Sequence, residues 1–174
     1  SWILEMLESG RDTFYTTENG EQAYWCPIEK HSVAIKPNPK VINLAIYKTG
    51  NKTLKRDLSA SVNDLGDGIL NVEFHSILQP TLNPIDGSYI EMINFALDLI
   101  ETGDYKSMVL GHQGANFCAG ANLNLILELC QNNMWDELDF AIKTLQDTTQ
   151  RIRFSKGPIV AAPFQLALGG GVEI

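Results

Sequence analysis

Two segments of this chain place small residues where a strand is expected to give way to a helix. They are 111-GHQGANFCAGANLNLI-126 and 164-FQLALGGGVEI-174. Glycine and alanine let a ligand approach the main chain closely, and the start of a helix offers free N–H groups with a partial positive charge. If the two segments converge, they can direct two N–H donors at one oxygen, which is the geometry of an oxyanion hole.

Each of these segments follows a short apolar stretch, and amphipathic stretches lie between and before them. The alternation predicts an α/β unit with a parallel sheet, in which ligands bind at the carboxyl ends of the strands. Strands are predicted at residues 69–75, 106–111 and 158–163, the last two as buried strands, and helices at residues 85–101, 122–131 and 135–153.

The first 56 residues have a different pattern. Residues 2–9 predict a short helix, and aromatic-rich arms around Asn19-Gly20 predict a β-hairpin. Its aromatic residues are expected to form a packing face against the next domain. Residues 41–47 are typical of a strand or an apolar tether, and the lysine-rich stretch 48–56 predicts a solvated linker.

Composition limits the class of protein. Across 174 residues, a hydrophobic content of 44% and a charged content of 20% are typical of a soluble globular protein. The net charge of −8 argues against nucleic acid as a partner. No apolar run approaches the ~18 residues of a membrane helix. Cys26, Cys118 and Cys130 form no C-x-x-C pair, so we expect reduced thiols in a cytoplasmic compartment.

Other kinds of site are poorly supported by the residues. The run Gly169–Gly171 lacks the lysine of a phosphate-binding P-loop and fails the dinucleotide-binding pattern at its last position. Cys118 with His112 lacks a third residue that would orient the base, so a small buried thiol is the simpler interpretation. The histidines and cysteines lack zinc-ligand spacing, so no metal site is expected, and G-x-S-x-G is absent.

The string 117-FCAGANL-123, followed by 156-KGPIVAAPFQLALGGGVEI-174, resembles the crotonase (enoyl-CoA hydratase/isomerase) superfamily over roughly residues 60–174. The earlier strings EMLESGRDTFYTTENGEQAYW and ASVNDLGDGILNVEFHS are most like enzymes in which a 3-hydroxyacyl-CoA dehydrogenase is fused to a crotonase domain. The resemblance implies that residues 1–50 end a dehydrogenase region, that 51–59 form a linker, and that 60–174 form the N-terminal half of a crotonase-like domain.

The same resemblance assigns roles to individual residues. It implies that the amides of Ala121 and Gly170 form the oxyanion hole for an acyl-CoA thioester. Glu173 falls at the position of the first catalytic glutamate, which positions water or shuttles a proton. From the residues alone, an acidic side chain in a first helical turn is more simply a partner of the helix dipole.

Contacts to coenzyme A follow from the resemblance as well. They are implied for Ala119, Ala121, Asn122, Leu123 and Gly169, and less strongly for Ser76 and Leu78. Three residues depart from the family pattern. Asn122 replaces a common aspartate, Gln79 a common asparagine, and Gln165 a glycine. If that glycine needs a left-handed backbone, Gln165 is strained and the aim of the Gly170 amide changes.

The resemblance therefore implies an enzyme of fatty-acid β-oxidation that hydrates or isomerises enoyl-CoA thioesters. The 3-hydroxyacyl-CoA dehydrogenase activity, with its NAD, is expected upstream of Ser1, and a second glutamate about 20 residues after Glu173, so this chain alone is expected to be inactive. Related proteins commonly form trimers. The alternative is a non-catalytic crotonase-like domain that serves docking or oligomerisation. The sequence does not decide between hydration and isomerisation, and it does not indicate the preferred acyl chain length.

Overall fold

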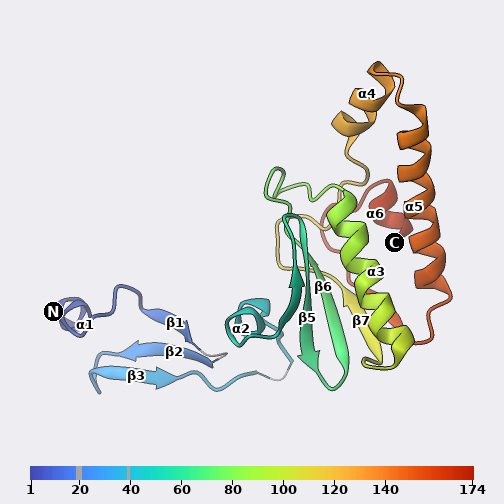
Figure 1. Ribbon diagram of the computed structural model, residues 1–174. Helices are drawn as coiled ribbons and strands as arrows, with labels where there is room; N and C mark the ends of the chain where they lie inside the picture. Colours follow the sequence, from blue (N-terminus) through green and yellow to red (C-terminus); the bar gives the residue numbers. More distant parts are fainter. Residues whose placement is uncertain (19–20, 39) are drawn as a thin grey trace. The chain divides into compact units, whose positions relative to one another are not determined.

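The computed structural model describes residues 1–18, 21–38 and 40–174 (Figure 1). The chain divides into two compact units, residues 1–52 and residues 53–174.

The first unit combines two helices with a small antiparallel sheet. The sheet has the order β1-β2-β3. The predicted short helix and both arms of the predicted hairpin are confirmed, whereas the Asn19-Gly20 turn lies outside the described residues. The elements are α1 (Trp2–Glu8), β1 (Tyr15–Glu18), β2 (Glu21–Cys26), β3 (His31–Ala34) and α2 (Leu44–Thr49).

The prediction of a strand or tether at residues 41–47 is wrong, because α2 begins inside it. The Asn43 side chain accepts a hydrogen bond from the Ala45 amide at 3.1 Å, so it caps the helix, and Leu44 is buried behind this cap. An asparagine at this position stabilises a helix start more than alternating apolar residues stabilise an isolated strand. The predicted solvated linker at 48–56 is also wrong, since it contains the end of α2 and the whole of β4 (Thr53–Arg56).

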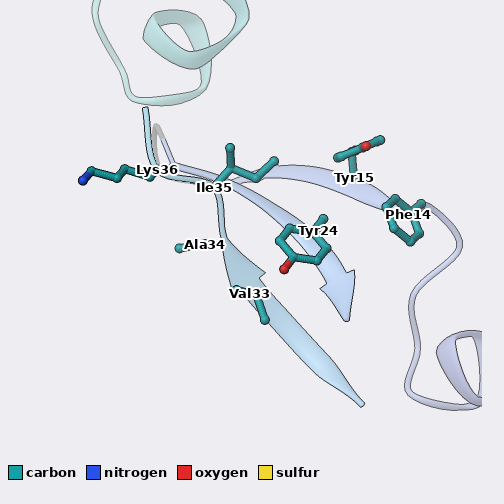
Figure 2. Close-up of a pocket in the computed structure, with 7 residues that line it drawn as sticks. All are labelled: Phe14, Tyr15, Tyr24, Val33, Ala34, Ile35 and Lys36. Carbon is teal, nitrogen blue, oxygen red and sulfur yellow. The ribbon is translucent and has the colours of Figure 1, made fainter. Parts of the chain in front are cut away.

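Aromatic residues of the first unit gather over one part of its small sheet. Phe14 packs edge-on against Trp2 and Tyr15, with ring centroids 5.8 and 4.9 Å apart. Figure 2 shows the shallow hollow, about 540 Å³, that Phe14, Tyr15 and Tyr24 line together with residues 33–36. The aromatic residues therefore pack within this unit, and Tyr15 is still 66% exposed.

The second unit is built on a mixed five-stranded sheet with the order β4-β5-β6-β7-β8. Strands β4 to β6 pair antiparallel, and β6 to β8 pair parallel. The predicted parallel sheet is thus confirmed for β6–β8, while the antiparallel strands β4 and β5 complete it. The remaining strands are β5 (Ala60–Gly66), β6 (Ile69–Phe74), β7 (Ser107–Leu110) and β8 (Ile159–Ala161).

Helix α3 (Gly87–Thr102) covers one face of this sheet and forms the core with it. Successive side chains of a strand point to opposite faces, so one alternate set of β5 and β6 meets the helix. Phe74 stacks on Tyr89 with ring centroids 3.8 Å apart. The other alternate set is polar, and its Asn71 side chain donates to the carbonyl of Gly111 at 2.7 Å. The core residues that are 2% exposed or less on β5, β6 and α3 are Ala60, Val62, Leu70, Val72, Phe74, Tyr89, Met92, Ile93, Ala96 and Leu97.

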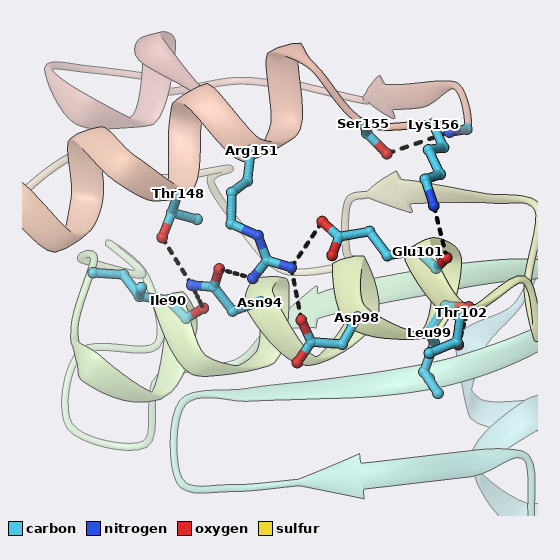
Figure 3. Close-up of polar contacts among 11 residues, drawn as sticks. Ile90, Asn94, Asp98, Leu99, Glu101, Thr102, Thr148, Arg151, Ser155 and Lys156 are labelled. Carbon is cyan, nitrogen blue, oxygen red and sulfur yellow. Dashed lines mark hydrogen bonds and ion pairs between the residues drawn. The ribbon is translucent and has the colours of Figure 1, made fainter.

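The helices after β7 match their predicted bounds closely. They are α4 (Leu123–Gln131) and α5 (Trp135–Arg153), followed by the short α6 (Gly170–Glu173). Helix α5 lies along α3, and Figure 3 shows that Arg151 joins the two. Its guanidinium donates to Asn94 and Asp98 at 2.6 Å each, and to Glu101 at 3.0 Å.

A strand is predicted correctly within residues 158–163, but the prediction that this strand is buried is wrong. Strand β8 is present, but Val160 is 56% exposed. In the sheet of the described residues β8 is the last strand, so it has a paired neighbour on one side only. An apolar run therefore predicted the strand correctly without fixing how much of it is covered.

Gly157, which lies between α5 and β8 in the chain, gives a direct test of the packing against the main chain that leads into β7. A Cβ atom at this position would lie 2.0 Å from the carbonyl oxygen of Lys106. We predict that Gly157→Ala lowers the free energy of unfolding by about 2–3 kcal/mol, because the main chain of both segments must move apart. Urea denaturation measures this change. At Gly87 an added Cβ meets nothing within 4 Å, so Gly87→Ala is the matched control, and an equal loss in both variants would contradict the packing described.

Candidate functional site

The two small-residue segments lie side by side and are joined by main-chain hydrogen bonds. Phe117 donates to the carbonyl of Phe164 at 3.3 Å, and Cys118 donates to that of Leu166 at 3.1 Å. In the other direction, Leu168 donates to the carbonyl of Cys118 at 2.9 Å. The loops after β7 and β8 therefore form one continuous backbone surface at the carboxyl ends of these strands.

Glycines make this contact possible. A Cβ atom at Gly120 would lie 2.7 Å from the carbonyl oxygen of Leu168 and 3.2 Å from the nitrogen of Gly170. A Cβ atom at Gly171 would lie 2.7 Å from the carbonyl oxygen of Cys118. Gly120 also has φ of 86°, and Gly169 has φ of 50° with ψ of −130°, conformations that side chains disfavour. Any larger residue at Gly120 or Gly171 would force the two turns apart.

Two amide groups at this junction are not used by the fold. Within the described part of the chain, neither Ala121 N–H nor Gly170 N–H has an acceptor within hydrogen-bonding distance. The 3.2 Å between the Gly170 nitrogen and the Cβ position of Gly120 limits the separation of the two nitrogens to about 7 Å by standard bond lengths. One oxygen can accept from both donors when their nitrogens are within about 6 Å of each other, and this upper limit is compatible with such a separation.

Glu173 lies on the same turn as the Gly170 amide. One carboxylate oxygen is 4.0 Å from the position that a Cβ of Gly170 would occupy, and the side chain is exposed. The acidic group therefore adjoins the amide pair and is accessible to a ligand. A carboxylate in this position can accept or return a proton close to a bound carbonyl.

An apolar cavity of about 710 Å³ opens beside the amide pair, between α3, α4 and α5. Ala121 belongs to its lining. A Cβ at Gly170 would be 2.9 Å from Ile85 and 3.5 Å from Leu145, and both side chains line the cavity. The unused amides thus stand at the edge of an apolar space. Its apolar side chains are those of Ile85, Ile90, Leu125, Ile126, Leu129, Leu138, Phe140, Ala141, Ile142 and Leu145.

The residues expected to contact coenzyme A are dispersed around this junction. Asn122 lines the cavity and caps α4, because its side chain accepts from the amides of Asn124 and Leu125 at 3.1 and 3.4 Å. The Ala119 amide donates to the carbonyl of Leu82 at 2.8 Å, and Leu123 is 74% exposed.

Ser76 and Leu78 lie on the loop before α3 and are not part of the cavity lining. Ser76 is buried, and its hydroxyl accepts from the Gln79 amide at 3.2 Å. It therefore shapes the turn at the end of β6. Leu78 is 91% exposed, so its side chain is accessible to a ligand outside the cavity.

Gln165 has a left-handed backbone, with φ of 51°. This is the conformation that would explain a glycine at this position in the family pattern, and it is strained for glutamine. The neighbouring Leu166 amide donates to the side-chain oxygen of Asn116 at 3.3 Å. That hydrogen bond helps to hold the turn, which leads onward to Gly170.

Sequence reasoning missed two asparagines that join the loops. Asn116 donates to the carbonyl of Thr81 at 2.8 Å, and Asn83 donates to the carbonyl of Asn116 at 3.2 Å. Asn83 is 2% exposed and has φ of 45°. Asparagine tolerates this left-handed backbone conformation well. An asparagine inside an irregular, partly apolar loop was therefore the one feature of the sequence that could have indicated this role.

His112 and Cys118 serve the fold. One ring nitrogen of His112 lies 2.9 Å from the carbonyl oxygen of Phe117, and the other accepts from the Gly114 amide at 3.0 Å, which fits a neutral ring. Burial lowers the pKa of His112, and burial raises the pKa of the Cys118 thiol. A histidine with a lowered pKa and a thiol with a raised pKa are poorly suited to act as a pair of base and nucleophile.

In the described ranges, no group of three or more His, Cys, Asp or Glu side chains is arranged to hold a metal ion. Over the same residues, no helix combines the length and the apolar character needed to cross a membrane.

No protein-family model matches the chain. The chain is 42% identical over 172 residues to the "Probable 3-hydroxyacyl-CoA dehydrogenase" of Bacillus subtilis (strain 168), a match that covers 99% of this chain and 21% of that protein. Over 69 residues it is 36% identical to the "Putative fatty acid oxidation complex trifunctional enzyme" of Rickettsia prowazekii (strain Madrid E), covering 40% of this chain and 10% of that protein. The chain therefore spans about a fifth or less of these relatives.

Solved structures share the fold of about two thirds of the chain. The crystal structure of an enoyl-CoA hydratase from Bacillus anthracis matches 66% of this chain and 43% of that chain, with a TM-score of 0.55 and 24% identity. This similarity confirms the predicted crotonase-like α/β fold for about two thirds of the chain.

The lowered pKa of His112 predicts a pH dependence of stability. Burial is the largest cause and opposes protonation in the folded state, and the hydrogen bond to Phe117 and the charge of Glu73 only partly offset it. Below the ordinary histidine pKa of about 6.5 the unfolded chain binds more protons than the folded one. We therefore predict that this contribution is present above that pH and is lost as the pH falls.

Urea denaturation of the chain and of His112→Asn between about pH 7.5 and 5 measures this contribution. The variant should lose less stability on acidification than the parent. His31→Asn, at an exposed site, is the control and should retain the parent's slope. Parallel slopes for the parent and His112→Asn would rule out a buried neutral ring.

Proposed function

We propose that the second unit binds an acyl-CoA thioester with its carbonyl oxygen between the amides of Ala121 and Gly170. The observation that carries this proposal is the pair of unused amides on one backbone surface beside an apolar cavity. The crotonase-like fold supports it, because enoyl-CoA hydratases are among the solved proteins that share that fold.

The proposed reaction is hydration or double-bond isomerisation of an enoyl-CoA. In hydration, the water oxygen bonds to Cβ, a proton is delivered to Cα, and the thioester oxygen carries negative charge in the enolate-like transition state. Two fixed N–H donors stabilise that charge, and loss of one such donor typically costs on the order of 2.7–4 kcal/mol. Glu173 accepts the proton of water or shuttles it, since its carboxylate adjoins the Gly170 turn.

The CoA moiety would lie along the start of α4. Ala119, Asn122 and Leu123 are the proposed contacts there, with Gly169 on the facing turn. The exposed Leu78 is a weaker candidate, and Ser76 would act through the turn that it shapes.

For the whole protein we propose a role in fatty-acid β-oxidation that includes NAD-dependent oxidation of 3-hydroxyacyl-CoA. The identity to the Bacillus subtilis protein, whose name describes a 3-hydroxyacyl-CoA dehydrogenase, supports this. Residues 1–50 would then close the dehydrogenase region, and 51–59 would lead into the crotonase-like domain. A cytoplasmic enzyme that assembles from identical copies fits the same proposal.

Docking without catalysis is the second candidate, because apolar side chains are exposed on α5. Trp135 is 56% exposed and Phe140 is 72% exposed. A docking domain would tolerate loss of Glu173 and of both amides. The experiment below separates the two candidates.

In the full-length protein, Glu173→Gln tests the catalytic proposal. The amide is nearly isosteric but cannot take a proton, so we predict that kcat for hydration of crotonyl-CoA falls by about 10²–10⁴-fold. The dissociation constant for the thioester, measured by calorimetry, should change little, because the oxyanion donors are untouched.

Glu137→Gln, on the exposed first turn of α5, is the matched control and should leave kcat unchanged. Unchanged turnover in Glu173→Gln would disprove the role of that residue. Absence of both thioester binding and turnover in the parent protein would favour the docking candidate.

A further inference from the structure

The first of the two turns at the site is also held from a second side, by residues 82–85 in the loop before α3. The Ala119 amide donates to the carbonyl of Leu82 at 2.8 Å, and the Ile85 amide donates to the carbonyl of Gly120 at 2.8 Å. These bonds are separate from the bonds that join this turn to the loop after β8. The loop before α3 therefore takes part in setting the position of the turn.

The hydrogen bond from Ile85 sets the direction of the Ala121 amide. The carbonyl of Gly120 and the N–H of Ala121 belong to one peptide group, and in a trans peptide these two bonds point in opposite directions. No cis peptide bond occurs in the described residues. Because Ile85 holds the carbonyl on its own side, the Ala121 N–H points away from Ile85. A shift of residues 82–85 would rotate this peptide group and change the aim of its N–H.

Asn83 fixes this segment through its side chain. Its oxygen accepts from the Ser76 amide at 3.0 Å, and its nitrogen donates to the carbonyl of Asn116 at 3.2 Å. The residue is 2% exposed, so water does not compete for these two bonds. Ser76 lies just after β6, and Asn116 directly precedes the first turn. One side-chain amide thus ties residues 82–85 to the end of a strand and to the turn itself.

The backbone on both sides of Ile85 is fixed as well. Asn83 has φ of 45°, and its amide donates to the carbonyl of Gln79 at 2.9 Å. Pro84 has a restricted φ and no N–H, so the Ile85 amide is the first donor after Asn83. Asp86 then caps α3 with its side chain. The Ile85 amide is thus held between a fixed turn and a fixed helix start.

From these contacts we infer that Asn83 is a positioning residue for the thioester reaction. It holds residues 82–85 in place, so that the Ile85 amide directs the Ala121 N–H at the thioester oxygen. This inference rests on the proposed function, because the aim of that N–H affects turnover only if a substrate oxygen accepts from it. Asn83 is outside the cavity lining, and both of its side-chain partners are main-chain groups. It therefore acts through the backbone and not by contact with the substrate.

Two substitutions in the full-length protein test this role. Asn83→Gly removes both side-chain hydrogen bonds, and glycine adopts the left-handed backbone of this position without strain. Asn83→Asp keeps the shape and the acceptor for the Ser76 amide, but an ionised carboxylate has no N–H to donate to Asn116. The matched control is Asn133→Gly. Asn133 is exposed in the turn between α4 and α5 and has φ of 55°, so the same replacement is made in a similar backbone conformation.

The expected result is a loss of turnover without a loss of binding outside the oxyanion site. Complete loss of one oxyanion donor lowers kcat by about 10²–10³-fold. A misdirected donor should cost less, so we expect both Asn83 variants to lower kcat for hydration of crotonyl-CoA by about 10–100-fold. Their dissociation constants for the S-octyl thioether of CoA, which has no carbonyl oxygen, should equal that of the parent in calorimetry. Asn133→Gly should keep both values of the parent.

Proton NMR identifies which donor is affected. In Asn83→Gly, the Ala121 amide proton should shift less on binding of octanoyl-CoA than it does in the parent. The Gly170 amide proton should keep most of its shift, because its peptide group is oriented by a different hydrogen bond. In that bond the Val172 amide donates to the carbonyl of Gly169 at 2.9 Å. An asparagine that served only general stability would not produce this difference between the two amides.

The outcomes separate this inference from the proposed function. An unchanged kcat in either folded Asn83 variant, or weaker thioether binding that accounts for the whole loss of turnover, would overturn the role of Asn83 and leave the proposed function standing. An equal loss of the Ala121 and Gly170 shifts would do the same. If the glycine variant does not fold, the aspartate variant carries the same comparisons. Absence of both hydration and thioester binding in the parent would instead overturn the proposed function.

Discussion

The site depends on the main-chain contact between residues 117–121 and residues 164–171. This contact brings two turns so close that a single Cβ atom at Gly120 or Gly171 would collide with a carbonyl oxygen of the opposite turn. Three hydrogen bonds between the segments fix their register. In this register the amides of Ala121 and Gly170 are left without protein acceptors in the described part of the chain. The small residues thus leave donors available that a more regular structure would have used.

The elements around this contact explain why it is stable. Strands β7 and β8 are parallel neighbours, so both loops leave the sheet at the same edge. The asparagines at positions 71, 83 and 116 connect these loops to β6 and to the segment before α3. The strained backbone at Gln165 lies within this network. Backbone strain of this kind persists only where the surroundings determine the conformation, and here the hydrogen bond between Leu166 and Asn116 contributes to that.

Much of the fold follows from local patterns in the sequence, and the errors have identifiable causes. Helices α4 and α5 are long and periodic, so their bounds match the prediction, and the two small-residue segments marked the turns. The antiparallel strand β4 was missed, because the lysine-rich residues 48–56 suggested solvent rather than an edge strand, and β5 was missed as well. The start of α2 was missed because Asn43 caps a helix inside an apolar run. Burial was predicted less well than secondary structure, because the burial of a strand or helix depends on which other elements pack over it. Strand β8 is the example.

The candidate site, too, could be predicted from the sequence only in part. The positions of Ala121, Gly170 and Glu173 could be proposed from a resemblance, since small residues and an acidic first turn are visible in the sequence. The cavity could not be predicted, because its lining comes from three helices whose relative orientation is set by tertiary packing. Arg151 and Asn94 illustrate this, since they are 57 residues apart in the chain and yet form the contact that bounds the cavity.

The proposed site requires the amides of Ala121 and Gly170 to donate to a thioester oxygen. The most direct measurement is the NMR shift of these two amide protons when the protein binds octanoyl-CoA, compared with the S-octyl thioether of CoA, which lacks the carbonyl oxygen. We predict that both protons move downfield with the thioester and much less with the thioether. Equal shifts with the two ligands, or shifts confined to other residues, would contradict it.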